Sequence, residues 1–354
     1  MRQSARNYKR IVIKIGSSLF YSSKNELDAD LVNEITGQIS QLVKEKKEVI
    51  LVTSGAIALG MSILKLGERP KELATLQAAA AIGQHELMDI YRRFFKGRQL
   101  NCGQVLLTWE DFSSRSRYLN AKNTLLKLLQ LNCIPVINEN DTVSTDEIRF
   151  GDNDRLSALV ATLVNADLLI MLSDVDGLLD RDKSLIRVVD SITPEIKALA
   201  TPTKRKTSVG GMITKIEAAK IAVDSGISCV IANGRTDGVI LSVVNDDQPT
   251  GTLFVSKERL TAKERWIAFG TKTKGRIFVD DGAKAALLNK KSLLCVGVTD
   301  LEGSFVEADV VSVRDRANVE FARGKVNLSA KVLEKVKGTR FDKEIIHRDN
   351  IVIL

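Results

Sequence analysis

The sequence is poor in the residues from which zinc sites and disulfide frameworks are built. Of its 354 residues only four are cysteine and two are histidine, and no Cys-x-x-Cys pair occurs. The cysteines, Cys102, Cys133, Cys229 and Cys295, are scattered along the chain, with no histidine at ligand spacing. These absences argue against structural zinc and against disulfides, and free or buried thiols are typical of a reducing compartment.

Long apolar runs and the common phosphate-binding loop are also missing. No hydrophobic run reaches the ~18 residues that a membrane helix needs, and Lys14 and Gly16 interrupt the apolar stretch after the basic N-terminus. We therefore expect neither a membrane span nor a signal peptide, and a cytoplasmic location. The pattern Gly-x-x-x-x-Gly-Lys-Ser/Thr is absent, which excludes a Walker A loop.

The composition that remains is that of an ordinary globular protein long enough for two domains. Hydrophobic residues make up 44% and charged residues 27% of the chain. The net charge is +8, and residues 256–354 hold 20 Lys and Arg against 14 Asp and Glu, so most of the excess lies there. A polyanionic partner and a solvated basic surface explain this excess about equally well.

The first ~255 residues alternate short β-branched segments with amphipathic helical patterns. This alternation predicts an α/β domain with an open, largely parallel sheet, helices on both faces, and a ligand at the carboxyl ends of the strands. The expected strands are 10–15, 49–53, 104–107, 134–137, 167–172 and 228–232, and the expected helices are 31–43, 72–95, 119–131, 154–164 and 212–224.

The last ~90 residues show a different pattern, which predicts a small, mostly β domain. We place the first domain at 1–257 and the second at 265–354, with a charged linker at 256–264 between them. The expected strands of the second domain are 275–279, 292–298, 305–313, 320–326 and 351–354, and its expected helices are 283–288 and 330–336.

Polar residues follow four of the predicted parallel strands, where the open-sheet rule places a ligand. Lys14 interrupts an apolar strand, and it is either an edge-strand lysine or a cation for phosphate. Turn chemistry explains asparagine and aspartate at 138–141 but not Glu139 between them. Likewise, a helix cap explains one carboxylate at 152–154 but not the second, nor Asn153.

The segment 209–215 is the clearest phosphate signal. Its glycines, Gly210 and Gly211, free backbone N–H groups at the start of a predicted helix, where the helix dipole is positive. Lys215 ends the first turn and supplies a full positive charge.

Several short motifs carry a family resemblance. They are IVIKIG at 11–16, VTSGAIA at 52–58, GQ at 83–84, NAKNTL at 120–125, PVINEND at 135–141, GDNDRLSA at 151–158, LSDVDGL at 172–178, GGMITK at 210–215 and GTLF at 251–254. Together they closely resemble the glutamate 5-kinase family of the amino-acid kinase superfamily. The tail resembles a PUA pseudo-barrel through RWIAFG at 265–270, VDDGA at 279–283 and HRDN at 347–350.

The resemblance implies transfer of the ATP γ-phosphate to the γ-carboxylate of L-glutamate, with Mg²⁺, as the first step of proline biosynthesis. It assigns Lys14, Lys215, Asp152 and Asp154 to catalysis and Ser54, Asp141 and Asn153 to glutamate. It assigns to ATP Lys14, Ser173, Asp174, Val209, Gly210, Gly211, Met212, Ile213, Thr214 and Lys215. Ser173 stands where the family commonly has threonine, and the metal ligands are not identified.

The residue types suit this chemistry. A carboxylate nucleophile is ionised at neutral pH, so the reaction needs alignment and cationic screening rather than a general base. We expect Lys14 and Lys215 to act from opposite ends of the site, with Asp154 orienting them. The alternatives are another kinase of the superfamily, acting on acetylglutamate, aspartate, carbamate or UMP, and an RNA-binding protein that uses the tail. The family also implies a dimer or tetramer, proline as a feedback inhibitor, and glutamate-5-semialdehyde dehydrogenase as a partner.

Overall fold

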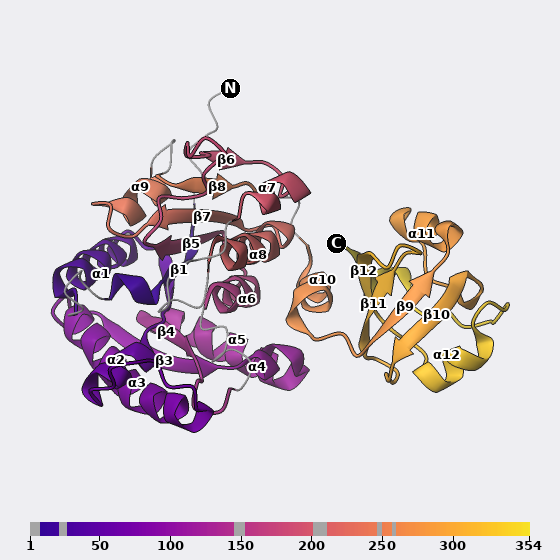
Figure 1. Ribbon diagram of the computed structural model, residues 1–354, viewed down its shortest axis with the longest axis horizontal. Coiled ribbons are helices and arrows are strands. Elements are labelled where there is room, and N and C mark those ends of the chain that lie inside the picture. Colours follow the sequence, from indigo (N-terminus) through magenta and orange to yellow (C-terminus); the bar gives the residue numbers. More distant parts are fainter. Residues whose placement is uncertain (1–7, 21–26, 145–152, 201–210, 246–249, 257–259) are drawn as a thin grey trace. The chain divides into compact units, whose positions relative to one another are not determined.

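The computed structural model describes residues 8–20, 27–144, 153–200, 211–245, 250–256 and 260–354. The chain divides into a larger unit, Met1–Asp111 with Ser116–Arg259, and a smaller unit, Phe112–Arg115 with Leu260–Leu354. Each unit has its own sheet (Figure 1).

The sheet of the larger unit is mostly parallel, as predicted. Its strand order is β3-β4-β2-β1-β5-β7-β8-β6. Strands β3, β4, β2, β1, β5 and β7 run parallel to one another, whereas β8 is antiparallel to β7. The strands are β1 (Arg10–Ile15), β2 (Glu48–Val52), β3 (Asn101–Leu107), β4 (Cys133–Glu139), β5 (Leu168–Ser173), β6 (Val188–Val189), β7 (Ser228–Asn233) and β8 (Thr252–Phe254).

Helices cover both faces of this sheet (Figure 1). Helices α1, α2, α3 and α9 share one hydrophobic core with the strands, while α6 and α8 pack on each other and on β1, β5 and β7 from the opposite face. The helices up to residue 245 are η1 (Ser17–Leu19), α1 (Ala29–Lys44), α2 (Ala56–Ile63), α3 (Leu73–Lys96), α4 (Trp109–Ser113), α5 (Arg115–Gln130), α6 (Asp154–Val164), α7 (Pro194–Ala198), α8 (Met212–Asp224) and α9 (Val239–Asn245).

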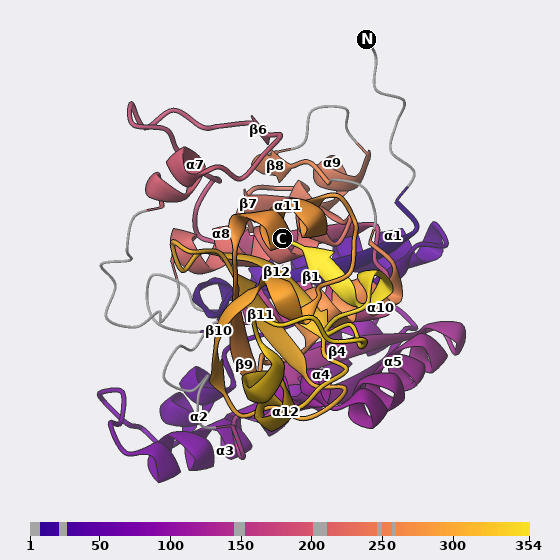
Figure 2. The ribbon, with the colours of Figure 1, turned by 90° about the vertical axis from the view of Figure 1, so that its right-hand side faces the viewer.

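The smaller unit is built on a sheet of order β10-β9-β11-β12-β13, in which only the β11–β9 pair is parallel (Figure 2). Leu287 of α11 and Leu333 of α12 are buried in its core. Its elements are α10 (Ala262–Arg265), η2 (Trp266–Gly270), β9 (Gly275–Val279), α11 (Asp281–Leu288), η3 (Cys295–Gly297), β10 (Val298–Gly303), β11 (Val310–Arg314), β12 (Glu320–Lys325), α12 (Ala330–Val336), η4 (Arg348–Asn350) and β13 (Ile351–Ile353).

The predicted elements differ from the structure where tertiary contacts override the local pattern. The predicted strand 292–298 is wrong, because the chain forms a single bridge from Leu293 to Ile346, then the turn η3, and enters strand β10 only at Val298. The sequence of β10, VTDLEG, is mostly exposed and therefore lacks a strand-like apolar pattern. The sequence prediction also omitted α2, whose N-cap is Gly55, and the φ of +102° at this position favours glycine.

Candidate active site

The strand order brings the predicted loops together. Strands β4, β2, β1 and β5 are neighbours, and all four run in the same direction. The chain moves from β1 to β2 on one side of β1 and returns to β5 on the other, which makes a topological switch at β1. The polar residues after these four strands therefore lie along one stretch of sheet edge.

Lys14 lies inside the sheet and not at its margin. Strand β1 pairs with β2 on one side and β5 on the other, so the edge-strand interpretation of Lys14 is excluded. Ile11, Ile13 and Ile15 face the core shared with α1. Because strand residues alternate between faces, Lys14 points to the opposite face, where α6 packs against β1. Its side chain is only 2% exposed.

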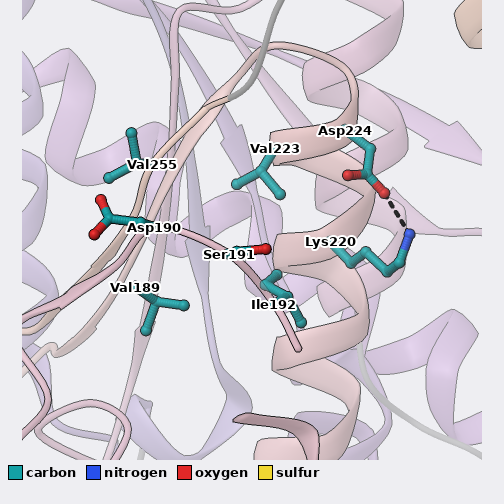
Figure 3. A pocket seen from close by; sticks show the side chains of 8 residues that line it. All are labelled: Val189, Asp190, Ser191, Ile192, Lys220, Val223, Asp224 and Val255. Carbon is teal, nitrogen blue, oxygen red and sulfur yellow. Dashed lines mark hydrogen bonds and ion pairs between the residues drawn. The ribbon is translucent and has the colours of Figure 1, made fainter. Parts of the chain in front are cut away.

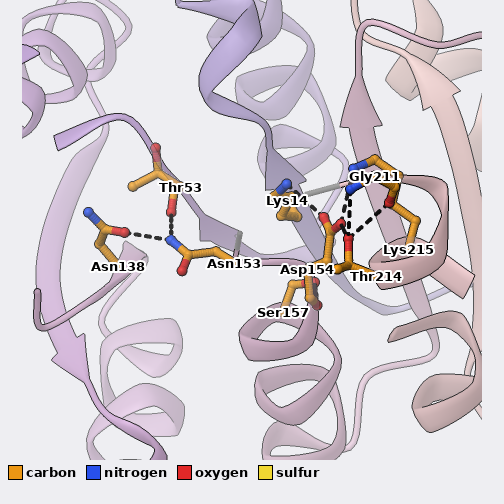
Figure 4. A network of polar contacts seen from close by, with 9 residues as sticks. All are labelled: Lys14, Thr53, Asn138, Asn153, Asp154, Ser157, Gly211, Thr214 and Lys215. Atoms are coloured by element: carbon orange, nitrogen blue, oxygen red, sulfur yellow. Dashed lines mark hydrogen bonds and ion pairs between the residues drawn. The ribbon is translucent and has the colours of Figure 1, made fainter. Parts of the chain in front are cut away.

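Asp154 joins both predicted lysines (Figure 4). Its Oδ1 lies 2.7 Å from Nζ of Lys14, and its Oδ2 lies 3.0 Å from Nζ of Lys215. The hydroxyl of Thr214 is 3.0 Å from the same Oδ2 and accepts a hydrogen bond of 3.2 Å from the backbone N–H of Gly211. The lysines therefore do not stand at opposite ends of the site, as the sequence suggested, but bind the two oxygens of one carboxylate.

Two helix starts hold this cluster. Asp154 is the first residue of α6, and Lys215 lies in the first turn of α8. An anion is favourable at a helix N-terminus and a cation is not, so the pairing with Asp154 offsets the unfavourable placement of Lys215. The N-cap residue of α6 is Asn153, and neither its side chain nor that of Asp154 caps the helix in the usual manner.

The electrostatics of the cluster favour an anionic ligand. Asp154 is fully buried, and Lys14 and Lys215 are nearly so. Charges are buried at high cost unless they are paired, and here two ammonium groups share one carboxylate, which leaves these three side chains with a net charge of +1. The N-terminus of α8 adds a partial positive charge.

A chain of amides adjoins the charged cluster (Figure 4). Nδ2 of Asn153 donates to the backbone carbonyl of Thr53 and to Oδ1 of Asn138, the latter at 2.6 Å. Asn138 in turn donates from Nδ2 to Oε1 of Gln84 at 2.7 Å. Asn153 thus links the residue that follows β2 to the last residues of β4, and it precedes Asp154, which binds the lysines.

The remaining predicted residues that the structure describes lie at the same edge. Ser54 follows β2 and Ser173 ends β5, and the hydroxyls of both are buried without a hydrogen-bond partner among the described residues. Asp141 follows β4, and Asp174 follows β5. Gly211, Met212, Ile213 and Thr214 begin α8, with Ile213 43% exposed. Asp152, Val209 and Gly210 lie outside the described residues.

The sequence interpretation gave no role to three residues that the structure brings to this edge. Thr53 contributes its backbone carbonyl, which no side-chain motif could signal. Gln84 reaches the site from α3, far from any predicted strand end. Arg69 lies near Asp141: burial lowers the pKa of Arg69, and the charge of Asp141 acts in the opposite direction.

A small cavity elsewhere in the larger unit is not part of this site (Figure 3). It lies beside the later turns of α8, where Lys220 and Asp224 form an ion pair. Its volume is about 10 Å³, which is room for one water molecule and not for a nucleotide.

Within the described ranges, no group of three or more His, Cys, Asp or Glu side chains is arranged to hold a metal ion. Likewise, no described helix is both long and apolar enough to cross a membrane.

Known proteins resemble the chain over nearly its whole length. Residues 9–233 match the amino acid kinase family, and residues 275–347 match the PUA domain. The chain is 44% identical to the glutamate 5-kinase of Thermoanaerobacter sp. (strain X514), over 98% of each protein. It is 43% identical to the glutamate 5-kinase of Rhodopseudomonas palustris (strain BisA53), over 98% of this chain and 97% of the relative.

One solved structure resembles the chain in its fold, at a sequence identity too low to indicate function. The N-acetylglutamate synthase of Neisseria gonorrhoeae, complexed with coenzyme A and N-acetyl-glutamate, superposes with a TM-score of 0.52 at 15% identity. The match covers 71% of this chain and 60% of that one. From the matched domains and the full-length relatives, the chain belongs to the glutamate 5-kinases of the amino acid kinase family.

Proposed function

We propose that this chain transfers the γ-phosphate of ATP to the γ-carboxylate of L-glutamate and so forms γ-glutamyl phosphate, the first step of proline biosynthesis. The observation that carries the proposal is the buried Lys14–Asp154–Lys215 cluster at the carboxyl edge of the parallel sheet. The curated relatives of similar length bear the name of this activity. Family membership and site chemistry therefore support the same reaction.

The reaction requires two anions to meet. A carboxylate oxygen of glutamate attacks the γ-phosphorus, the bond from that phosphorus to the β,γ-bridging oxygen breaks, and ADP leaves with the bond's electrons. No proton moves in this step, because the nucleophile is already ionised. Lys14 and Lys215 would screen the charge that develops on the transferred group, and Asp154 would hold their ammonium groups in place.

The polar groups beside the cluster suit the two substrates. Ser54 and Ser173 each have a buried hydroxyl that lacks a partner among the described residues, which fits contact with glutamate and with nucleotide respectively. Asn153 would bind glutamate beside Asp154, and Asp141 would attract its ammonium group. Asp174 and the start of α8, with Gly211 through Lys215, would contact ATP.

We propose Mg²⁺ as the partner of ATP, held mainly by the phosphates. This ion usually takes one or two protein carboxylates, with substrate phosphates and water completing its shell. In the described part of the chain, Asp154 is committed to two lysines and no three-residue metal cluster forms. When bound, the ion would neutralise phosphate charge. Asp152 stays a predicted catalytic residue outside the described ranges.

The other expectations also stay proposals. They are a cytoplasmic location, a dimer or tetramer, feedback inhibition by proline, glutamate-5-semialdehyde dehydrogenase as a partner, and domains at 1–257 and 265–354. RNA binding by the second domain has a direct test, which is a salt-sensitive gel shift with tRNA.

A hydroxamate assay tests the activity. The protein is incubated with ATP, Mg²⁺ and hydroxylamine, which converts an acyl phosphate to a coloured hydroxamate, and with L-glutamate, L-aspartate or N-acetyl-L-glutamate in turn. ADP release is followed in parallel with carbamate and UMP. We expect hydroxamate with L-glutamate alone. Product with one of the other acceptors, and none with glutamate, would assign the chain to a different reaction.

A further inference from the structure

The amide chain beside the cluster has a fixed direction. The oxygen and nitrogen atoms of a side-chain amide look alike, so they are assigned from partners that can only donate or only accept a hydrogen bond. The backbone carbonyl of Thr53 can only accept, so the atom of Asn153 that contacts it is Nδ2. The backbone N–H of Glu139 can only donate, so the atom of Asn138 that it contacts, at 2.9 Å, is Oδ1.

These two backbone contacts are consistent with each other, and they determine how the amide of Gln84, the last one in the row, is oriented. Nδ2 of Asn153 donates to Oδ1 of Asn138, as both contacts require. Nδ2 of Asn138 then faces Gln84, whose near atom must be the acceptor Oε1. The row of amide hydrogen bonds therefore ends on Nε2 of Gln84. This donor is shielded from solvent and has no hydrogen-bond partner among the described residues.

Close packing of α3 on α2 sets the backbone position of Gln84. A Cβ atom on its neighbour Gly83 would lie 1.8 Å from the carbonyl oxygen of Ala56, so α3 approaches α2 as closely as two backbones can. A buried donor without an acceptor costs about 1–3 kcal/mol, and the hydrogen bond from Asn138 to Oε1 orients the amide that carries this donor. An acceptor supplied by a ligand removes that cost.

We propose that Gln84 is a substrate-positioning residue that donates from Nε2 to the α-carboxylate of the bound amino acid, while its Oε1 holds Asn138 in orientation. The inference rests on the proposed function, because it assumes that the γ-carboxylate reacts at the lysines. In Figure 4 the amides of Asn153 and Asn138 extend away from the lysine cluster, and Nδ2 of Asn138, the atom that donates to Gln84, belongs to the more distant of the two amides. The group that Gln84 meets is therefore the end of the substrate away from the phosphate.

The test exchanges the donor for an acceptor on the enzyme and the acceptor for a donor on the substrate. Gln84→Glu keeps an oxygen for Asn138 but replaces Nε2 by a second oxygen. The α-amide of L-glutamic acid keeps the reacting γ-carboxylate but offers an N–H₂ donor where glutamate has an α-carboxylate oxygen. KM and kcat for both substrates and for ATP are measured by the hydroxamate assay on the full-length protein.

We expect Gln84→Glu to raise the KM for L-glutamate about tenfold or more, because a charge-assisted bond is replaced by repulsion. The KM for ATP should stay within about twofold, and the preference for L-glutamate over its α-amide, as a ratio of kcat/KM, should fall about tenfold or more. Equal losses with both substrates would mean that Gln84 only supports the fold, and would overturn the inference.

Two further variants keep the outcome decisive. Gln84→Met removes the donor without adding charge. If Gln84→Glu does not fold, the KM of Gln84→Met is the deciding measurement. A KM for L-glutamate within about twofold of wild type would then overturn the inference. Gln130→Glu, the same exchange at an exposed glutamine at the end of α5, should leave all constants unchanged. If the wild-type protein itself forms no hydroxamate with L-glutamate, the proposed function fails and not the role of Gln84 alone.

Discussion

Asp154 shows how a single buried side chain can hold two reactive groups. Its two oxygens bind Lys14 and Lys215, and the hydroxyl of Thr214 shares one of them. An aspartate that is engaged in this way is poorly placed to accept a proton, and phosphorylation of a carboxylate does not require it to. Its effect is to fix where two positive charges stand before the substrates arrive, which reduces reorganisation during the reaction.

Lys215→Ala tests this arrangement at the scale of one residue. Because the ammonium group would act mainly on charge that develops in the transition state, we expect kcat to fall about 10²–10³-fold, with a much smaller change in the KM for glutamate. The hydroxamate assay measures both. Lys220→Ala is the matched control, since Lys220 lies further along α8 and pairs with Asp224. Normal turnover by Lys215→Ala would remove this lysine from catalysis.

At the scale of elements, the contact between α2 and α3 determines how residues on α3 reach the site. Gly60 of α2 and Gly83 of α3 both lie where a Cβ atom would meet opposing backbone at 1.8 Å. Both helices also pack, through Leu59 and Leu87, on the hydrophobic core that they share with the strands of the large sheet. Since backbone atoms cannot rotate away as side chains can, these glycines set the helix spacing and with it the position of Gln84.

Gly83→Ala should therefore loosen this helix pair. Alanine alone would favour the helix by up to ~1 kcal/mol, but separating α2 from α3 is expected to cost more, for a net loss of about 1–3 kcal/mol. Chemical denaturation measures the change. Gly97→Ala at the end of the same helix is the control, because its Cβ would meet only ordinary contacts at 3.6 Å. Equal stability of Gly83→Ala and wild type would contradict this account of the spacing.

At the scale of the whole molecule, the two units have separate hydrophobic cores. The core of the larger unit is built from the parallel strands and α1, α2, α3 and α9, whereas the core of the smaller unit lies between its own sheet and α11 and α12. The Lys14–Asp154–Lys215 cluster and the amide chain belong entirely to the larger unit. Stability of the smaller unit and chemistry in the larger one should therefore be separable.

Val313→Ala tests whether the smaller unit can lose stability without a loss of activity in the larger unit. Val313 is fully buried in β11, so we expect the smaller unit to lose about 2 kcal/mol of stability from the cavity that the missing methyl groups leave. Thermal or chemical unfolding should show this loss, while kcat and KM for glutamate stay within about twofold. Val319→Ala, at a valine that is 57% exposed in the same unit, should change neither. A parallel loss of activity in Val313→Ala would mean that the two units unfold together.

The sequence by itself determined the elements whose signals are local. The β-branched run at β1 and the helical periods at α6 and α8 predicted bounds that the structure confirms, and a lysine inside an apolar strand already marked Lys14 as unusual. The alternation of strands and helices likewise predicted the parallel sheet, because each such crossover requires it.

Only the tertiary structure decided how these residues meet. That Lys14 lies on a central strand follows from strand order, and its meeting with Asp154 follows from the packing of α6 on that strand's other face. The direction of the amide chain depends on backbone groups of Thr53 and Glu139, to which no sequence pattern points. Contacts between residues far apart in the chain are set by how whole elements pack, and local periodicity carries no record of that packing.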